Sequence, residues 1–87
     1  MLERDVEKAL CDRVKELGGL CEKFTSPNRK NVPDRIVTLD NRIIFVELKA
    51  PNKTPTKAQE RDHNRRRKLG CDVRVIDSVG VANAFPN

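Results

Sequence analysis

Apolar residues recur every three to four positions over the first part of the chain. They are Leu2, Val6, Leu10, Val14 and Leu17. This spacing places them on one side of a helix. Gly18 and Gly19 follow directly, and glycine commonly ends a helix because it tolerates a positive φ. The pattern predicts an amphipathic helix over residues 2–17.

Apolar and polar residues alternate in the next stretch, as they do in β-strands. We expect a short strand over residues 20–24 and a hairpin over residues 33–49. Asp40 and Asn41 suit a two-residue turn because both residue types tolerate positive φ, and Leu39 then pairs with Arg42. Apolar residues occur on both faces of the hairpin, so both faces should be at least partly covered.

A second helix is predicted after a linker, residues 50–55, that contains two prolines. Thr56 is a suitable N-cap for a helix that runs through Leu69 and ends at Gly70. A strand over residues 71–76 and a short helix from Ser78 to Phe85 complete the chain. The predicted order is helix, strand, strand, strand, helix, strand, helix. This order indicates an α/β domain with a mixed sheet, in which the last strand pairs parallel to the second hairpin strand through a helical crossover.

Two carboxylates and a lysine interrupt the apolar hairpin. Counting back from the turn, Asp34 falls opposite Glu47, and like charges at that separation repel. Lys49 shares the face of Glu47 because side chains alternate along a strand. We therefore expect a divalent cation between the carboxylates, with the backbone carbonyl of Leu48 as a further ligand. Lys49 would orient or deprotonate a water or neutralise a phosphate, so the cluster indicates phosphodiester chemistry.

The overall charge favours a polyanionic partner. The 87 residues include 18 Lys and Arg against 13 Asp and Glu, a net charge of +5, which points first to nucleic acid and second to an anionic membrane. No apolar run has the length of a membrane span and no signal-peptide core is present, so a cytoplasmic location is expected. The small size makes a dimer plausible.

Basic residues gather in three segments that could contact DNA. They are Arg29 and Lys30 in the loop before the hairpin, Lys53 in the linker, and Lys57, Arg61, Arg65 and Lys68 along one side of the second helix, widened by Arg66 and Arg67. The chain has no Trp or Tyr and only three Phe. It should therefore read backbone shape and charge rather than stack on bases.

Histidine and cysteine carry no prediction of function. His63 is expected to be an exposed residue of the second helix. Cys11, Cys21 and Cys71 lack CxxC spacing and a zinc-finger partner, so we expect three reduced and mostly buried thiols.

The charged hairpin residues carry a family resemblance. Val32-Pro33-Asp34, twelve further residues and then Glu47-Leu48-Lys49 resemble the PD-(D/E)xK signature of the restriction-endonuclease-like superfamily. A wider set resembles the virus-type replication-repair nuclease (VRR-NUC) domain of stand-alone phage or bacterial type, over nearly the whole of residues 1–87. That set is Glu7, Gly18-Gly19, Lys23-Phe24, Pro33-Asp34-Arg35, Phe45-Val46-Glu47-Leu48-Lys49-Ala50, Gln59, Gly70 and Val73-Arg74-Val75-Ile76.

The resemblance implies a role for each matching residue. Asp34 and Glu47 would bind Mg²⁺ or Mn²⁺, and Lys49 would be the catalytic lysine. Glu7 would add an acidic group from the first helix; it is preferred to Glu3 because its spacing to the glycine pair matches better. Gln59 would lie near the scissile phosphate.

The implied activity is that of a structure-specific DNA endonuclease in a single domain with a restriction-endonuclease-like core. Stand-alone members resemble Holliday-junction resolvases that work as homodimers, in the host cytoplasm if phage-encoded. No organic cofactor and no membrane partner are implied. Alternatives are a nuclease for flaps and other branched repair intermediates, a non-catalytic nucleic-acid-binding module of the same fold, or a basic subunit that acts only within a larger assembly.

Overall fold

The computed structural model describes residues 1–87, and its elements follow the predicted order. They are α1 (Glu3–Glu16), β1 (Leu20–Lys23), β2 (Arg35–Leu39), β3 (Arg42–Leu48), α2 (Lys57–Lys68), β4 (Asp72–Ile76) and α3 (Val79–Ala84). The ends differ from those predicted by a residue or so, within the usual fraying of element boundaries. The predicted N-caps are confirmed, because the side chains of Thr56 and Ser78 accept hydrogen bonds from backbone N–H groups in the first turns of α2 and α3.

The four strands form one mixed sheet in the order β1-β2-β3-β4. β1, β2 and β3 pair antiparallel, whereas β3 and β4 pair parallel. The predicted hairpin register is confirmed: Leu39 lies opposite Arg42, and Asn41 in the turn has a φ of 61°. The parallel pairing of the last strand is likewise as predicted.

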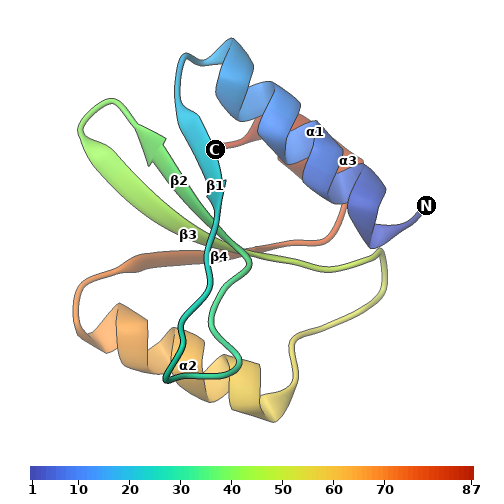
Figure 1. Ribbon diagram of the computed structural model, residues 1–87. Coiled ribbons are helices and arrows are strands. Elements are labelled where there is room, and N and C mark those ends of the chain that lie inside the picture. The colour runs from blue at the N-terminus through green and yellow to red at the C-terminus, as the bar shows by residue number, and fades with distance from the viewer.

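Helices cover both faces of the sheet, so the domain has three layers. Figure 1 shows α1 and α3 packed together on one face and α2 on the other. The apolar core lies between the sheet and the helices α1 and α3. Its members are Val6, Leu10, Val14, Val37, Ile44, Val46, Leu48, Ile76, Ala82 and Phe85.

The predicted end of α1 is confirmed and is tightly packed. Gly18 has a φ of 81°, and the Gly19 N–H donates to the Val14 carbonyl at 2.9 Å. A Cβ atom on Gly19 would lie 2.5 Å from the carbonyl oxygen of Thr38. Only a residue without a side chain therefore lets α1 approach β2 this closely.

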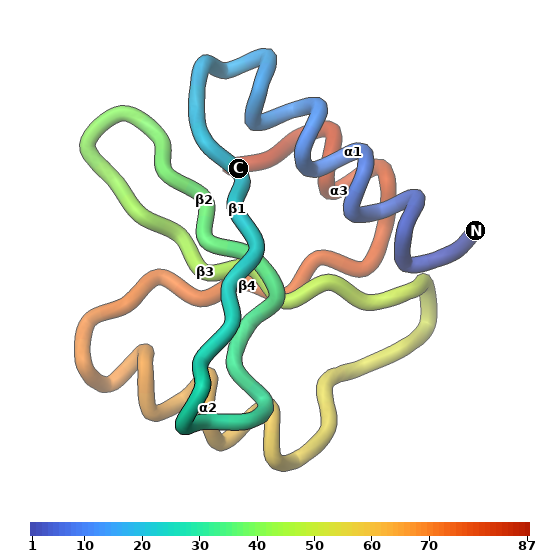
Figure 2. Tube along the Cα trace, in the orientation of Figure 1, coloured from blue at the N-terminus to red at the C-terminus, as the bar shows by residue number.

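The opposite face of the sheet is covered in a different way. The buried residues of α2 are Asp62 and His63, so this helix contacts the sheet largely through polar side chains. The backbone trace in Figure 2 shows that the loop between β1 and β2 runs beside α2. None of the helices combines the length and apolar character needed to cross a membrane.

Candidate active site

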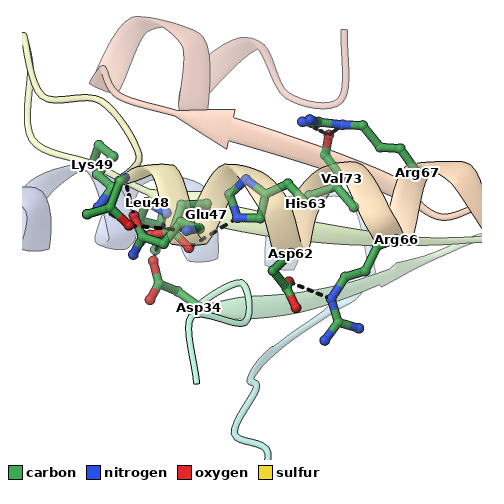
Figure 3. Close-up of polar contacts among 11 residues, drawn as sticks. Asp34, Glu47, Leu48, Lys49, Asp62, His63, Arg66, Arg67 and Val73 are labelled. Atoms are coloured by element: carbon green, nitrogen blue, oxygen red, sulfur yellow. Dashed lines mark hydrogen bonds and ion pairs between the residues drawn. The ribbon is translucent and has the colours of Figure 1, made fainter. Parts of the chain in front are cut away.

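Asp34 and Glu47 lie at the junction between the antiparallel and parallel parts of the sheet. Arg35 pairs with Val46, so the next pair along the ladder is Asp34 and Glu47. Both side chains lie on the α2 face (Figure 3). One oxygen of Asp34, Oδ2, accepts a hydrogen bond from the Leu48 N–H at 2.8 Å, which fixes its carboxylate beside the end of β3.

Glu47 is a buried carboxyl group in an unfavourable electrostatic position. The residue is 2% exposed, and burial together with the Asp34 carboxylate raises its pKa to about 7, against an opposing effect of Lys49. Its Oε1 atom has no hydrogen-bond partner. Because an unpaired buried carboxylate is costly, this position favours either a proton or a cation next to Glu47.

Lys49 and Gln59 both approach the other oxygen of Glu47. Lys49 Nζ lies 3.5 Å from Oε2, and Gln59 Nε2 donates to the same atom at 3.3 Å. Gln59 is held in place by the capping box of α2, where its Oε1 accepts from the Thr56 N–H at 2.9 Å. The amide of Gln59 is therefore oriented with its NH₂ group toward Glu47.

His63 is a site residue that the sequence did not reveal. It was expected to be exposed, but it is 1% exposed and its Nε2 lies 3.7 Å from Glu47 Oε1. Neither atom has a hydrogen-bond partner. Burial lowers the pKa of His63, and the Arg67 guanidinium acts in the same direction.

The position of His63 follows from helix geometry. It is one turn after Gln59, so both residues lie on the same face of α2. The expectation was wrong because that face is polar and lacks the apolar periodicity by which a buried face is normally found. The spacing from Gln59, once Gln59 is placed in the site, is the signal that would have identified it.

Glu7 lies apart from the two hairpin carboxylates. Its Oε2 accepts from Arg35 Nε at 3.0 Å, and Arg35 also donates to the Cys21 carbonyl. No group of three or more acidic, histidine or cysteine side chains is placed to hold a metal ion together. The structure therefore shows a pair of carboxylates with Lys49 beside them, and the role of Glu7 stays a prediction.

The three cysteines are free and half-buried. The sulfur atoms of Cys11 and Cys21 lie 3.1 Å apart, between α1 and β1. This contact brings together two thiols that are ten positions apart in the sequence.

The predicted DNA-contacting residues are on the surface. Those exposed to solvent are Arg29, Lys30, Lys53, Lys57, Arg61, Arg65 and Lys68. Arg67, which was expected to widen this surface, is also exposed, whereas Arg66 is half-buried; both arginines contact the protein. Arg66 lies over the rings of Phe24 and Phe45 at 5.2 Å and 5.3 Å, and Arg67 donates to the Val73 carbonyl.

The fold and the hairpin residues define a class of protein. A mixed sheet between helices, with Pro33-Asp34 beside the strand that ends in Glu47-Leu48, is the arrangement of a restriction-endonuclease-like PD-(D/E)xK domain. No family model matches the chain.

Comparison with known proteins narrows the class. A solved structure described as a VRR_NUC domain superposes with a TM-score of 0.89 at 36% identity, covering 95% of this chain and 91% of that one. The chain is also 47% identical over 85 residues to Putative nuclease p44 of Acyrthosiphon pisum secondary endosymbiont phage 1, covering 97% of this chain and 91% of that protein. The chain belongs to the VRR-NUC family.

Proposed function

We propose that the protein is a metal-dependent, structure-specific DNA endonuclease that cuts four-way junctions as a homodimer. The observation that carries the proposal is the buried pair of carboxylates. Glu47 lies beside Asp34, one of its oxygen atoms has no hydrogen-bond partner, and Lys49 reaches the other oxygen. Such an arrangement is electrostatically unfavourable in the protein alone and becomes favourable when a cation joins it.

The donor set suits a hard divalent ion. Asp34 and Glu47 offer carboxylate oxygens, and the Leu48 carbonyl is the predicted backbone ligand, which together fit Mg²⁺ or Mn²⁺. Such an ion supplies an activated water and neutralises charge that builds up on the phosphate. Lys49 would hold the attacking water or a non-bridging phosphate oxygen, because its ammonium group already lies 3.5 Å from Glu47 Oε2.

Gln59 and His63 would position Glu47 rather than act on the substrate themselves. Gln59 donates to Oε2, and the His63 ring closes the buried side of Oε1. Groups that orient a metal-ligating carboxylate commonly affect metal affinity strongly. For Gln59 this differs from the role implied by family resemblance, which placed it near the scissile phosphate.

The surface charge supports a branched DNA substrate. The exposed basic residues of α2 and of the β1–β2 loop lie on the α2 face of the sheet, so the duplex backbone can approach the carboxylates from that side. The exposed apolar residues Leu20 and Ile43, which both pair with Thr38 in the sheet, offer area for self-association. A two-fold dimer would bring two cutting sites to one junction, one for each strand.

The test is cleavage of matched DNA structures by the pure protein. Labelled four-way junction, flap and linear duplex are incubated with Mg²⁺, Mn²⁺ or EDTA, and the products are resolved on denaturing gels. We expect symmetric nicks in the junction that require metal. Lys49→Ala should abolish cutting, whereas Lys15→Ala should not, because Lys15 is an exposed lysine on α1, across the sheet.

Each part of the proposal has its own contrary result. Cutting that persists in Lys49→Ala would remove this residue from the mechanism, and cutting in EDTA would refute metal dependence. Cleavage confined to flaps would identify a flap nuclease instead. Sedimentation of the protein with and without junction tests the dimer, which a monomer at all active concentrations would refute.

A further inference from the structure

A basic pocket lies on the α2 face, separate from the carboxylate pair. It has a volume of about 220 Å³ and is lined by Arg29, Asp62, Arg65, Arg66 and Leu69. Three arginines and one aspartate give it a formal charge of +2. The pocket is therefore suited to an anion, although one of its own walls is acidic.

Asp62 organises two of the three arginines. Its side chain is only 4% exposed, and each of its oxygens accepts from a different guanidinium: Oδ1 from Arg29 at 3.4 Å and Oδ2 from Arg66 at 2.8 Å. Both carboxylate oxygens are thus satisfied within the protein. The buried aspartate ties the β1–β2 loop to α2 and holds two otherwise flexible cations at defined positions.

Arg66 has the stiffest placement of the three arginines. Its guanidinium lies over the rings of Phe24 and Phe45, and only its Nε is engaged in a hydrogen bond, with Asp62. Its terminal NH₂ groups have no acceptor in the protein. A planar guanidinium held in this way matches the geometry of phosphate oxygens, and little side-chain entropy is lost when it binds them.

The pocket is placed to act together with the carboxylate pair. Asp62 directly precedes His63, which contacts Glu47, and Figure 3 shows Asp62 and Arg66 farther along the same helix. The loop that carries Arg29 leads into Asp34. A DNA strand lying along α2 would therefore pass both positions.

We propose that this pocket binds a backbone phosphate of the DNA other than the one that is cut, and so fixes the position of the cut along the strand. This inference rests on the proposed endonuclease function. The preference of cations for the C-terminal end of a helix explains why basic residues gather in the last turn of α2. It does not explain why a buried aspartate holds Arg66 and an arginine from a separate loop in one pocket.

Binding of a four-way junction, measured by fluorescence anisotropy at increasing KCl, tests the phosphate contact. The variant is Arg65→Ala, because Arg65 is exposed and makes no hydrogen bond that its loss would break. We expect weaker binding and a slope of log K against log [KCl] that is smaller by about 0.9. The matched control is Arg4→Ala on α1, which removes an equal charge across the sheet and should leave the slope unchanged. Equal slopes for both variants would overturn the inference.

Asp62→Asn separates an organised pocket from a simple charged one. The substitution keeps the size of the side chain and makes the pocket more positive. If Asp62 serves to position the arginines, binding should weaken, and the cuts should spread over neighbouring phosphodiester bonds. Tighter binding by Asp62→Asn would show that charge alone matters and would refute the organising role; a thermal melt establishes that the variant is folded.

These measurements also distinguish the pocket from the proposed reaction. Binding is measured without any need for cleavage. A protein that cuts no junction but shows the smaller slope in Arg65→Ala would refute the endonuclease proposal and retain the phosphate site. A protein that cuts junctions but shows an unchanged slope in Arg65→Ala would support the endonuclease proposal and refute the phosphate site.

Discussion

Replacing Glu47 by glutamine should make the metal-free protein more stable at neutral and alkaline pH. Glu47 is buried beside Asp34, and these two causes raise its pKa to about 7 from an ordinary value of 4.5. Glutamine has nearly the same size and carries no charge at any pH. The substitution therefore removes the repulsion between the carboxylates while preserving the packing beneath α2.

The magnitude and sign follow from proton linkage. Between pH 4.5 and about 7 the folded protein keeps the proton on Glu47 while the unfolded chain has released it, so stability falls as the pH rises through this range. Above pH 7 no further change comes from this group. At about 1.36 kcal/mol per pKa unit, the shift corresponds to a loss of about 3 kcal/mol. For a domain of this size that is a large share of the total stability.

Urea unfolding in EDTA, followed by circular dichroism from pH 4.5 to 8, measures the effect. The free energy of unfolding of Glu47→Gln relative to the wild type should rise by about 3 kcal/mol over this range. Glu22→Gln, which changes an exposed glutamate on β1, should follow the wild-type profile. Parallel pH profiles for Glu47→Gln and the wild type would refute the burial argument.

Divalent metal should cancel most of the stability advantage of Glu47→Gln. Mg²⁺ at about one hundred times its dissociation constant would stabilise the wild type by about 2.7 kcal/mol. The same addition should have little effect on Glu47→Gln, which lacks one of the two carboxylates. Equal stabilisation of both proteins by Mg²⁺ would show that the ion binds elsewhere.

Further predictions concern the support of Glu47 and the end of α1. Gln59→Ala and His63→Ala should each lower Mn²⁺ affinity, measured by calorimetric titration, by about 10- to 100-fold; unchanged affinity would exclude a positioning role. Gly19→Ala should lower the free energy of unfolding by about 1–3 kcal/mol because its Cβ would clash with the Thr38 carbonyl. Gly80→Ala meets no atom within 4 Å and should stabilise α3 by about 0.5–1 kcal/mol. If Gly19→Ala and Gly80→Ala changed the free energy of unfolding in urea equally, the close approach of α1 to β2 at Gly19 would be contradicted.

The sequence predicted the fold well because its local signals agree with its tertiary packing. The apolar spacing of α1 corresponds to residues that are buried in the core, such as Val6 and Leu10. The turn at Asp40 and Asn41 sets the hairpin register, and the period of two along the strands then places Asp34 and Glu47 on one face. Each step needs only backbone geometry and side-chain alternation.

The surroundings of Glu47 were harder to predict because α2 has no apolar stripe. Hydrophobic periodicity identifies a buried face only where that face is apolar. In α2 the buried side is formed by Asp62 and His63, and Arg66 contacts aromatic rings from β3 and the end of β1. Such contacts join segments that are distant in the sequence, so no local sequence pattern predicts them.

The same polarity relates the structure of α2 to its proposed function. An apolar helix on this face would exclude water and ions from Glu47 and would contribute hydrophobic stability. The polar helix instead contacts the sheet through Gln59 and His63 at the carboxylate, and through Arg66 at the basic pocket. Attachment of α2 to the sheet and assembly of the site thus depend on the same side chains, so substitutions of Gln59, His63 or Arg66 should weaken binding and also loosen α2. Hydrogen exchange of α2 amides should accordingly slow when Mg²⁺ and DNA are added, while exchange in α1, whose contacts are apolar, stays unchanged.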